Sequence, residues 1–397
     1  MRGFLPFLIL LLAVAFFTRV DLFFHLLYAL FSLYFLGRLW ARRSTGAVLV
    51  QRHHDRRMFL GDTLSITVDI HNRGWLPVLW LQLSDAIPGE LVVGQSFRHA
   101  LSLLPRERRS LTYTVHGRRR GYYPVGPLVT KGGDLLGTTT YEHRFAEQDF
   151  LIVYPRIVPL VEARLPSQSP SGVLPSRHRL FEDPARIRGV RDYQPGDSLR
   201  RIDWKTSSRV GTLQVRRYEP AISLETAILL NLNREDYPLR KWRSATELGI
   251  VIAASLATHL IEKRQAVGLA TNGRDPLTES PDRSPCLPLR KGRAHLMHML
   301  DLLARVEAVD DLDDPPFLDL VNRRSLALPW GSTAIVITAR GVEGLSDILL
   351  ALRRRGLSVT LVVTCPGHEF LTTVWQGEQI GVQVLRISSD RDMDIWR

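Results

Sequence analysis

The sequence predicts an α+β multidomain protein with four successive parts. These are an N-terminal transmembrane helical hairpin (1–41), a β-sandwich domain (46–160), a linker and signature region (161–220) and an α/β domain (221–397). Three observations predict this order: two apolar runs at the start, then period-two alternation, then strands alternating with helical patterns. A length of 397 residues suits about two to three domains of roughly 150 residues each. Hydrophobic residues form 45% of the chain, which indicates folded protein.

The predicted hairpin rests on the two apolar runs. Residues Phe4–Phe17 are unbroken apolar sequence, and Leu22–Leu36 form a second run that extends to Trp40. A membrane-spanning helix needs about 20 such residues. The second run meets this length, whereas the first, at 14 residues, spans only if the flanking Arg2 and Arg19 reach the lipid headgroups. We therefore predict two antiparallel helices in a membrane.

Two alternatives concern the same segment. Ala13-Val14-Ala15 has the small-x-small pattern of a signal-peptide cleavage site. The second apolar run follows it at once, which favours the hairpin. In the other alternative, a single helix spans the membrane while the first run lies in the interface.

Flanking charge predicts the orientation. One acidic residue, Asp55, accompanies six arginines after the second run: Arg38, Arg42, Arg43, Arg52, Arg56 and Arg57. Positive charge favours the cytoplasmic side. We expect a protein of the cell's inner (cytoplasmic) membrane, with the lipid bilayer as a partner and the soluble part facing the cytoplasm.

Short strands dominate the next segment. Apolar and polar residues alternate over Leu64–Ile70, Val78–Leu83 reads as the following strand, and Gly121–Pro127 reads as a turn-rich edge. This spacing predicts a β-sandwich that resembles an immunoglobulin-like domain. It lacks that domain's cysteine pair, since Cys286 and Cys365 are the two cysteines of the chain.

The last part alternates strands with helices, which predicts a mostly parallel sheet covered by helices on both faces. The predicted buried strands are Leu224–Leu232, Val267–Ala270, Ala334–Thr338, Val359–Cys365 and Val382–Ile387, and the predicted helices are Trp242–Lys263, Ala294–Val306 and Leu345–Arg355.

A charged block precedes this domain. Between Arg177 and Arg217 there are 11 basic and 5 acidic residues, a local balance of 11 − 5 = +6. Pro195-Gly196-Asp197 has the residues of a tight turn, and Asp197 is placed to cap a helical turn after it. Carboxylates among so many arginines are expected to form bidentate pairs.

This block resembles the signature of the domain-of-unknown-function 58 family, R-x-Y-x-P-G-D-x-x-R-x-I-D-W-K. The candidate signature residues, for partner binding or for structure, are Arg191, Asp192, Tyr193, Pro195, Gly196, Asp197, Arg200, Ile202, Asp203, Trp204 and Lys205. The order of parts also resembles the family, whose last region is similar to a von Willebrand factor A domain of Rossmann type. The resemblance implies no established activity, and it implies a MoxR-type AAA+ ATPase as partner.

That similarity raises the question of a metal-ion-dependent adhesion site. Such sites begin with D-x-S-x-S after the first strand, and their oxygens hold Mg²⁺. Here Asn231 replaces the aspartate, Asn233 replaces the first serine, and Arg234 adds positive charge. The later strand end at Thr338-Ala339-Arg340 offers no aspartate. We predict a degenerate site that holds neither metal nor cofactor.

An enzymatic alternative uses Asp203-Trp204-Lys205. This tripeptide matches half of a metal-dependent nuclease site, with Asp192 or Asp197 as a second ligand. The net charge of 52 − 40 = +12 suits a phosphodiester substrate. Such tripeptides are common, however, Trp204 could instead fill a core, and nearby arginines neutralise the carboxylates. No nucleic-acid partner is expected, because the basic clusters carry no interleaved aromatic platform.

The prediction is thus a membrane-anchored, non-enzymatic adaptor or assembly factor. By resemblance it would partner a MoxR-type AAA+ ATPase in maturing or remodelling other proteins. The alternative is a metal-dependent hydrolase or nuclease that uses the Asp-Trp-Lys motif.

Overall fold

The structure is a computed structural model. It describes residues 4–18, 21–92, 97–134, 139–145, 149–160, 182–194, 202–220, 225–278, 284–310, 317–339, 344–367, 370–389 and 391–393, with Asp197 and Leu199. The chain divides into two compact units, and each is described by itself. The first is Met1–Arg156 with Leu300–Arg305, and the second is Ile157–Met299 with Val306–Arg397.

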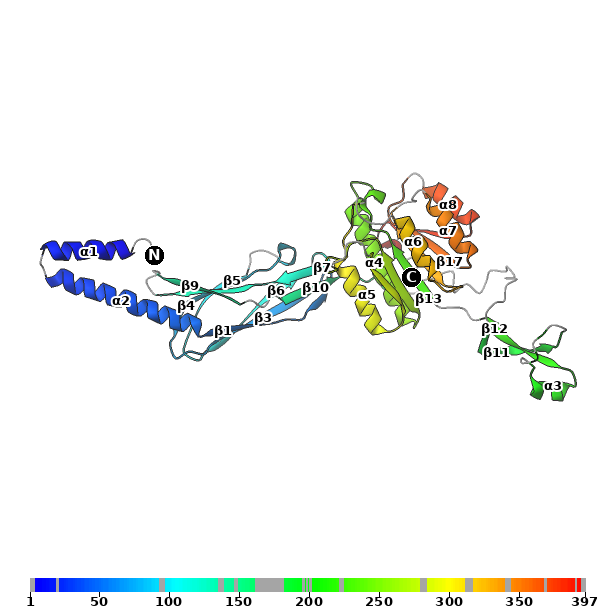
Figure 1. The fold of residues 1–397 in the computed structure, drawn as a ribbon, viewed down its shortest axis with the longest axis horizontal. Helices are drawn as coiled ribbons and strands as arrows, with labels where there is room; N and C mark the ends of the chain where they lie inside the picture. The colour runs from blue at the N-terminus through cyan, green and yellow to red at the C-terminus, as the bar shows by residue number, and fades with distance from the viewer. Residues whose placement is uncertain are drawn as a thin grey trace. The chain divides into compact units, whose positions relative to one another are not determined.

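Two apolar helices begin the first unit. α1 (Phe4–Thr18) and α2 (Asp21–Gly46) lie side by side and antiparallel (Figure 1). Within the described residues, α2 and α4 (Trp242–Glu262) are long and apolar enough to cross a membrane. The apolar stretch of α2 is exposed, whereas α4 is mostly buried in the core of the second unit. An N-terminal apolar helix of the predicted kind is therefore present.

The helix predicted to reach Trp40 continues to Gly46. Its last turn differs from the rest of α2 because small side chains there are buried: Ala41, Ser44 and Thr45. Both hydroxyl groups donate to the carbonyl oxygen of Ala41. This turn contacts the following β domain, which the apolar pattern could not predict.

Ten strands follow in the described residues up to Tyr154, arranged in three sheets of order β1-β3-β6, β5-β4-β8-β9 and β2-β10-β7. They are β1 (Val48–His53), β2 (Arg57–Phe59), β3 (Thr63–Asn72), β4 (Val78–Asp85), β5 (Arg98–Leu103), β6 (Arg108–His116), β7 (Gly121–Val125), β8 (Leu128–Gly133), β9 (Thr140–Phe145) and β10 (Asp149–Tyr154), with a short 3₁₀ turn, η1 (Gly89–Leu91).

The first two sheets enclose a common apolar core. Val68 and Ile70 of β3 contact a cluster that includes Leu81 and Leu83 of β4. In both strands, buried residues alternate with more exposed ones, as expected when successive side chains point to opposite faces. The predicted turn-rich edge at Gly121–Pro127 does lie at the edge of a sheet, but most of it is strand β7, paired antiparallel with β10, and not turn.

The second unit contains a hairpin and most of an α/β domain. The end of one helix of that domain, Leu300–Arg305, belongs to the first unit. The hairpin is β11 (Glu182–Asp192), α3 (Trp204–Val210) and β12 (Gln214–Pro220). The α/β domain contains β13 (Glu225–Leu230), η4 (Arg234–Asp236), α4, β14 (Ala266–Thr271), β15 (Cys286–Arg290), α5 (Arg293–Arg305), α6 (Phe317–Leu326), β16 (Thr333–Thr338), α7 (Leu345–Arg354), β17 (Ser358–Val363), α8 (Phe370–Gln379) and β18 (Gln383–Arg386).

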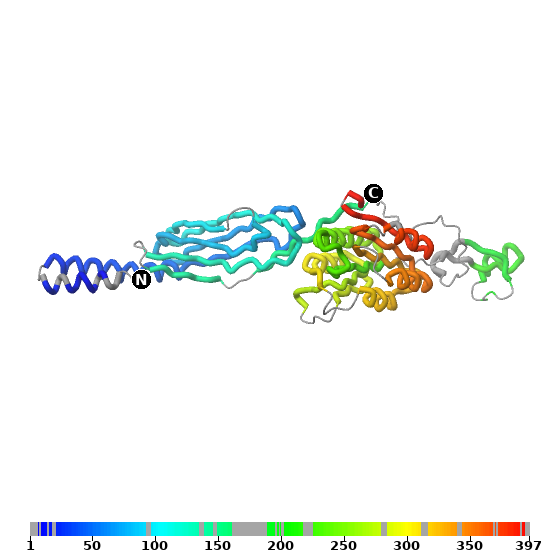
Figure 2. The backbone as a smooth tube through the Cα atoms, turned by 90° about the horizontal axis from the view of Figure 1, so that it is seen from above, coloured from blue at the N-terminus to red at the C-terminus, as the bar shows by residue number. Residues whose placement is uncertain are grey.

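The six-stranded sheet has the order β15-β14-β13-β16-β17-β18, with β15 antiparallel and all other pairs parallel. Helices cover both faces (Figures 1 and 2). Leu229 of β13 packs with Leu320 of α6 and Leu349 of α7. Its neighbour Leu230 points to the other face, where Gly249 lets α4 approach closely. The predicted α/β alternation is therefore present, and the mixed α+β arrangement is confirmed.

Sequence periodicity missed four elements of this domain: β15, α6, α8 and the short 3₁₀ turn η4. The predicted strand Val359–Cys365 also ends two residues early, at Val363. β15 shows why: exposed and half-buried residues alternate on this edge strand, so it carries no continuous apolar run. Of the predicted linker, residues 161–181 lie outside the described residues.

Candidate functional site

The family-type motif lies on the hairpin, which we call the signature hairpin (Glu182–Pro220). β11 and β12 pair antiparallel, and α3 lies in the connection between them (Figure 1). The hairpin has its own small core, in which Ile202 and Val215 are buried and bridge the two segments. Among the predicted site residues, Pro195, Gly196 and Arg200 lie outside the described residues.

Asp197 is held by an arginine of the motif. The Arg191 guanidinium donates to both carboxylate oxygens, at 2.6 and 2.7 Å. The same carboxylate accepts the backbone N–H of Gln194 at 2.9 Å. The predicted bidentate pair is thus confirmed at Arg191 and Asp197. Because both oxygens accept strong donors, this carboxylate fixes the turn after β11.

Asp203, not Asp197, caps the helix. Its Oδ1 accepts the backbone N–H of Thr206 at 3.0 Å, and its Oδ2 accepts Arg216 Nε at 3.1 Å. Asp197 lies seven positions before the start of α3 and does not cap that helix. Its predicted role in the turn directly after it stays a prediction, because Ser198 and Arg200 lie outside the described residues. The Thr206 N–H, followed by the Arg216 guanidinium, holds the pKa of the Asp203 carboxyl below its usual range. Asp203 is therefore ionised at neutral pH and joins α3 to β12.

Asp192, the third carboxylate of the motif, pairs with Gln214. The Gln214 amide donates to Asp192 Oδ1, and the Gln214 backbone N–H donates to Ser207 Oγ at 2.8 Å. Tyr193 extends the hairpin through its backbone N–H, which donates to the Leu213 carbonyl at 2.8 Å. Each of the three acidic residues therefore has a partner within the hairpin.

Apolar side chains of the same hairpin face solvent instead. Trp204 is 67% exposed, which overturns the alternative that it fills a core. It stands in the first turn of a seven-residue helix in which Ser207 is the buried residue. Four further apolar side chains are exposed, and together with Trp204 we call them the apolar set: Val190, Leu199, Val210 and Leu213. Lys205 is exposed beside Trp204.

The second predicted site is a polar rim at the carboxyl ends of the parallel strands. Asn231 directly follows β13 and is fully buried. Its Oδ1 accepts the backbone N–H of Asn233 and the side-chain amide of Asn272, both at 3.0 Å. Its Nδ2 donates to Asp236 Oδ2 at 2.7 Å and to Thr338 Oγ1 at 3.2 Å. We call these five residues the amide rim.

The Asn233 backbone fixes the direction of the Asn231 amide. A backbone N–H can only donate, so the oxygen of Asn231 must face it, and the nitrogen faces Asp236 and Thr338. A hard cation such as Mg²⁺ requires oxygen ligands, but here an N–H₂ group stands between two acceptor oxygens. Within the described residues, no group of three or more His, Cys, Asp or Glu side chains is placed to hold a metal ion.

Sequence reasoning named Asn231 and Asn233 but missed the contributions of Asn272, Asp236 and Thr338. A signal was present, because polar residues stand at or directly after the ends of three neighbouring parallel strands. The carboxyl ends of such strands meet at one edge of the sheet. Asp236 could not be found in this way, since the 3₁₀ turn η4 brings it back to the rim.

Arg234 and Tyr237 seal the rim. The Arg234 guanidinium lies 2.6 Å from Asp310 Oδ2 and 4.2 Å from the centre of the Trp242 ring. The Tyr237 hydroxyl donates to the Asn231 carbonyl at 2.5 Å. Burial, with the nearby Asp236 charge, raises the pKa of Tyr237 well above its usual value. The amide rim is therefore a closed network of hydrogen-bonded polar groups and not an open ligand pocket.

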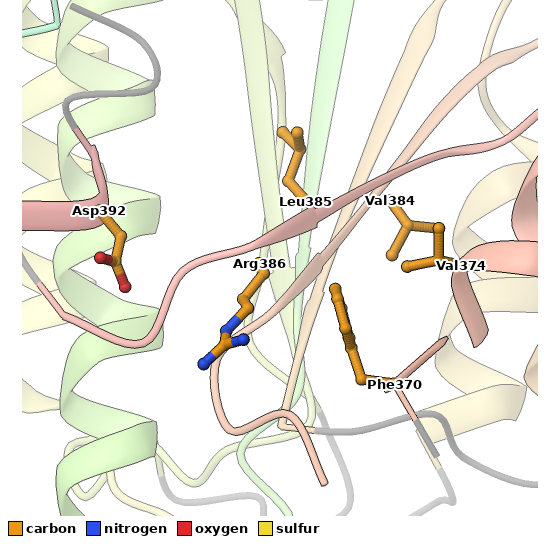
Figure 3. Close-up of a pocket in the computed structure, with 6 residues that line it drawn as sticks. All are labelled: Phe370, Val374, Val384, Leu385, Arg386 and Asp392. Atoms are coloured by element: carbon orange, nitrogen blue, oxygen red, sulfur yellow. The ribbon is translucent and has the colours of Figure 1, made fainter. Parts of the chain in front are cut away.

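A hollow of about 490 Å³ lies beside the edge strand β18 (Figure 3). Phe370 and Val374 of α8 and Val384 of β18 form its apolar side, with Arg386 and Asp392 at its polar end. Hydrogen bonds from backbone N–H groups of the preceding turn hold the pKa of Asp392 below its usual range. No sequence motif predicted this hollow. It offers one positive and one negative side chain beside an apolar wall.

Fold and sites together define a class: a mixed α+β protein with an apolar N-terminal helix pair, a β domain, and an α/β domain preceded by an arginine-rich signature hairpin. The resemblance to the domain-of-unknown-function 58 family is confirmed. The model of that family, described as "Protein of unknown function DUF58", matches residues 189–325. The chain is also 27% identical over 316 residues to the "Uncharacterized protein YeaD" of Bacillus subtilis (strain 168), covering 77% of this chain and 73% of that protein.

Solved structures give weaker likenesses. Part of the chain (28%) is similar to 17% of an Escherichia coli alpha-2-macroglobulin fragment, with 24% identity and a TM-score of 0.25. A second likeness covers 27% of this chain and 91% of the CARDB domain of a Pyrococcus furiosus protein in complex with di-metal ions. The identity is 18% and the TM-score is 0.20. Scores this low support no argument about fold or ligands.

Proposed function

We propose that this protein is a membrane-anchored, non-enzymatic adaptor or assembly factor that presents its signature hairpin to a partner protein. One observation carries the proposal. The acidic residues of the motif are engaged within the hairpin, while Trp204 and the rest of the apolar set are exposed on it. A catalytic site needs the reverse, with accessible polar groups in a sheltered pocket. Tryptophan is enriched in the hot spots of protein-binding surfaces.

The end of the β domain next to α2 supports the membrane anchor. The Trp40 indole donates to the Pro77 carbonyl at 3.0 Å, and the Arg73 N–H donates to the Ala47 carbonyl at 3.0 Å. These bonds join the loop after β3 to the end of α2. That loop carries Trp75, which is 73% exposed. Tryptophan is enriched where protein meets lipid headgroups.

Charge supports the cytoplasmic side. The arginines after the apolar part of α2 outnumber acids six to one over Arg38–Arg57, and positive flanks stay in the cytoplasm. Protease added outside intact cells should leave the soluble part whole. Digestion of that part from outside would overturn this orientation.

Strand order supports a von Willebrand factor A-like assignment of the α/β domain, and the paired sheets support an immunoglobulin-like β-sandwich. Counted from β13, the sheet follows the doubly wound order 3-2-1-4-5-6, with an antiparallel edge strand. The amide rim stands where a metal-ion-dependent adhesion site would lie, and Asn231 there presents a nitrogen. In this proposal the domain is a scaffold whose rim binds no metal.

The proposed partner is a MoxR-type AAA+ ATPase, and protein maturation or remodelling is the proposed process. The resemblance to the family motivates this partner. The hairpin supplies the chemistry for it, since an apolar set beside basic residues fits a surface with apolar pockets and acidic rims. Because the function of the family is not established, the partner has to be identified by experiment.

The test is affinity purification of the full chain from native membranes. We expect Trp204→Ala to reduce the captured ATPase at least tenfold, about 1.4 kcal/mol of binding free energy. Trp375→Ala is the matched control, because Trp375 is 60% exposed but lies on α8. Asp197→Asn and Asp203→Asn should also abolish capture, since each loosens the hairpin. Undiminished capture by all three hairpin variants would reject the hairpin as the binding element.

The hydrolase or nuclease alternative makes an opposite prediction. It expects Mg²⁺- or Mn²⁺-dependent cleavage by the full chain that is lost in Asp203→Asn. Asp203 already accepts two donors, a backbone N–H and an arginine, which opposes metal binding. Calorimetric titration with divalent ions should therefore give no heat.

A further inference from the structure

Two loops of the β domain lie side by side next to the end of α2. They are residues 73–77, between β3 and β4, and residues 104–107, between β5 and β6, and we call them the tip loops. The backbone N–H of Arg106 donates to the Gly74 carbonyl at 3.3 Å and joins the two loops. The bonds described above hold the first loop to the end of α2. The tip loops therefore lie beside the point at which the chain leaves its exposed apolar helix.

Each tip loop exposes one large apolar side chain. Trp75 is 73% exposed on the first loop, and Leu104 is 67% exposed on the second. The neighbouring Leu76 and Leu103 are buried in the β domain, so each loop turns one apolar side chain inward and the next one outward. Single exposed apolar residues are ordinary on a protein surface, whereas a group of them indicates a contact surface. Two on joined loops, close to the apolar helix, indicate such a surface.

The side chain of Asn72, which is fully buried, fixes the backbone of both tip loops. Its amide donates to the carbonyls of Leu76 at 2.9 Å and Leu104 at 3.0 Å. Its Oδ1 accepts the Gly74 N–H at 2.9 Å. In the second loop, the Leu104 N–H donates to Glu107 Oε2 at 2.6 Å. Because the backbone is held from inside, the outward side chains can bind a surface without the cost of ordering the loops.

Positive charge accompanies these apolar side chains. The acid of the tip loops, Glu107, accepts Arg109 Nε at 2.7 Å, so its charge is matched within the β domain. Four exposed arginines lie on the tip loops or in the last two turns of α2: Arg42, Arg43, Arg73 and Arg106. The surface beside the end of α2 is therefore both apolar and basic.

A bilayer that carries anionic lipid fits both features, because tryptophan favours the headgroup level and arginines are attracted to a negative leaflet. We propose that the tip loops form a second membrane contact. Trp75 and Leu104 enter the headgroup layer, and Arg73 and Arg106 bind anionic phospholipid headgroups. This inference rests on the proposed membrane anchor and goes beyond it, since the helices could hold the chain in the membrane while the tip loops stay in water.

The experiment uses the full chain reconstituted into vesicles of phosphatidylcholine, alone or mixed equally with phosphatidylglycerol. Both kinds contain the same share of lipid brominated near the top of its acyl chains. Bromine quenches nearby tryptophan, and the Trp75 signal is the difference between the natural chain and Trp75→Phe. We expect strong quenching of this signal in the anionic vesicles, weaker quenching in phosphatidylcholine, and loss of the difference at high salt, which screens the charges.

A double variant, Arg73→Gln with Arg106→Gln, tests the basic part of the surface. It removes two charges and leaves Trp75 and Leu104 in place. In the anionic vesicles, the quenching gives the ratio of docked to undocked tip loops. We expect this ratio to fall roughly thirtyfold, which corresponds to about 1 kcal/mol for each arginine near an anionic surface.

The matched control is Arg118→Gln with Arg119→Gln. Both arginines are exposed, but they follow β6, at the end of that strand away from the tip loops, so the quenching should stay that of the natural chain. Quenching that does not depend on phosphatidylglycerol, or that falls equally in the control, would overturn the proposal. Absence of quenching in both kinds of vesicle would also overturn it and would point to a protein partner for the tip loops.

Alkaline extraction of membranes distinguishes this failure from failure of the anchor. A chain that stays in the membrane fraction but shows no quenching of Trp75 overturns the second contact alone. A chain released by alkali overturns the anchor, and the second contact with it.

Discussion

The signature hairpin and the amide rim place similar polar groups in opposite surroundings. In the hairpin, Asp197 and Asp203 bind arginines near the surface, and the nearby apolar side chains are exposed. In the rim, Asn231 is wholly buried and its amide is satisfied on both sides. Both regions resemble metal sites in sequence, and both are polar networks closed by internal donors.

The difference teaches where each region should respond to change. A surface ion pair contributes little to global stability, because water competes for both partners. A buried amide with several partners contributes much to global stability. Its loss leaves those buried partners without a hydrogen bond, because neither water nor another polar group replaces it. We expect substitutions in the rim to change the free energy of unfolding, and substitutions in the hairpin to change binding and local order.

The largest expected effect is that of Asn231→Ala. It removes the partner of the Asn233 N–H, the Asn272 amide and the Asp236 carboxylate, all at the buried rim. We expect a loss of about 3 kcal/mol in the free energy of unfolding of the α/β domain, measured by urea denaturation. A loss below about 1 kcal/mol would show that the rim is not a closed network.

Asn231→Asp should have the next largest effect, and it sharpens the comparison. The new carboxylate replaces an N–H₂ group that lies 2.7 Å from Asp236 Oδ2. Two carboxylates this close cannot both stay ionised, so one pKa is raised. Stability should then fall by about 2 kcal/mol at neutral pH and recover as the pH falls through the raised pKa.

Millimolar Mg²⁺ should also restore the stability of Asn231→Asp, because the ion would bind between the two carboxylates. It should leave the stability of the natural chain unchanged. Thermal unfolding with and without Mg²⁺ measures this. A Mg²⁺ effect on the natural chain would contradict the closed-rim interpretation.

Arg191→Lys should act on the hairpin alone. Lysine cannot donate two parallel bonds to Asp197, so the turn that holds the Gln194 N–H loosens. The global free energy of unfolding should change by less than about 0.5 kcal/mol, while hydrogen exchange at Gln194 becomes faster. If Arg191→Lys lowered the global free energy of unfolding as much as Asn231→Ala does, the proposed difference between the two regions would be wrong.

The smallest expected effect is the loss of the stabilising contribution of Asp203 at acidic pH. Because the folded pKa of Asp203 is lowered, its stabilising contribution is fully present above about pH 3.9, the ordinary value of an aspartate. It is lost as the pH falls through the lowered folded pKa. The NMR signal of the Thr206 amide should report this loss, and Asp203→Asn should remove the transition.

Sequence patterns predicted much of this fold and little of its sites. The alternation over β3 and the apolar runs of β13, β14, β16 and β17 mark strands, because burial on one or both faces leaves a regular pattern. The arginine-rich block also predicted that bidentate pairs form, and the structure has one between Arg191 and Asp197. Asp203 as helix cap was missed because the start of α3 depends on where the chain turns after Asp197.

The amide rim could not be predicted as a network. Asn231, Asn272 and Thr338 are separated by 41 and 66 positions, and a parallel sheet alone brings them together. The contact between α2 and the β domain is similar, since Gly37 and Asp134 meet only after α2 packs on that domain.

By itself, the sequence determined the classes of elements, the apolar N-terminal helices and the family resemblance, because these depend on periodicity and on neighbouring residues. Tertiary structure alone decided that Trp204 faces solvent, that Asn231 turns its nitrogen toward Asp236, and that Asp134 lies beneath α2. Those outcomes depend on which distant segments pack together, and local patterns carry no information about partners that are far away in the chain.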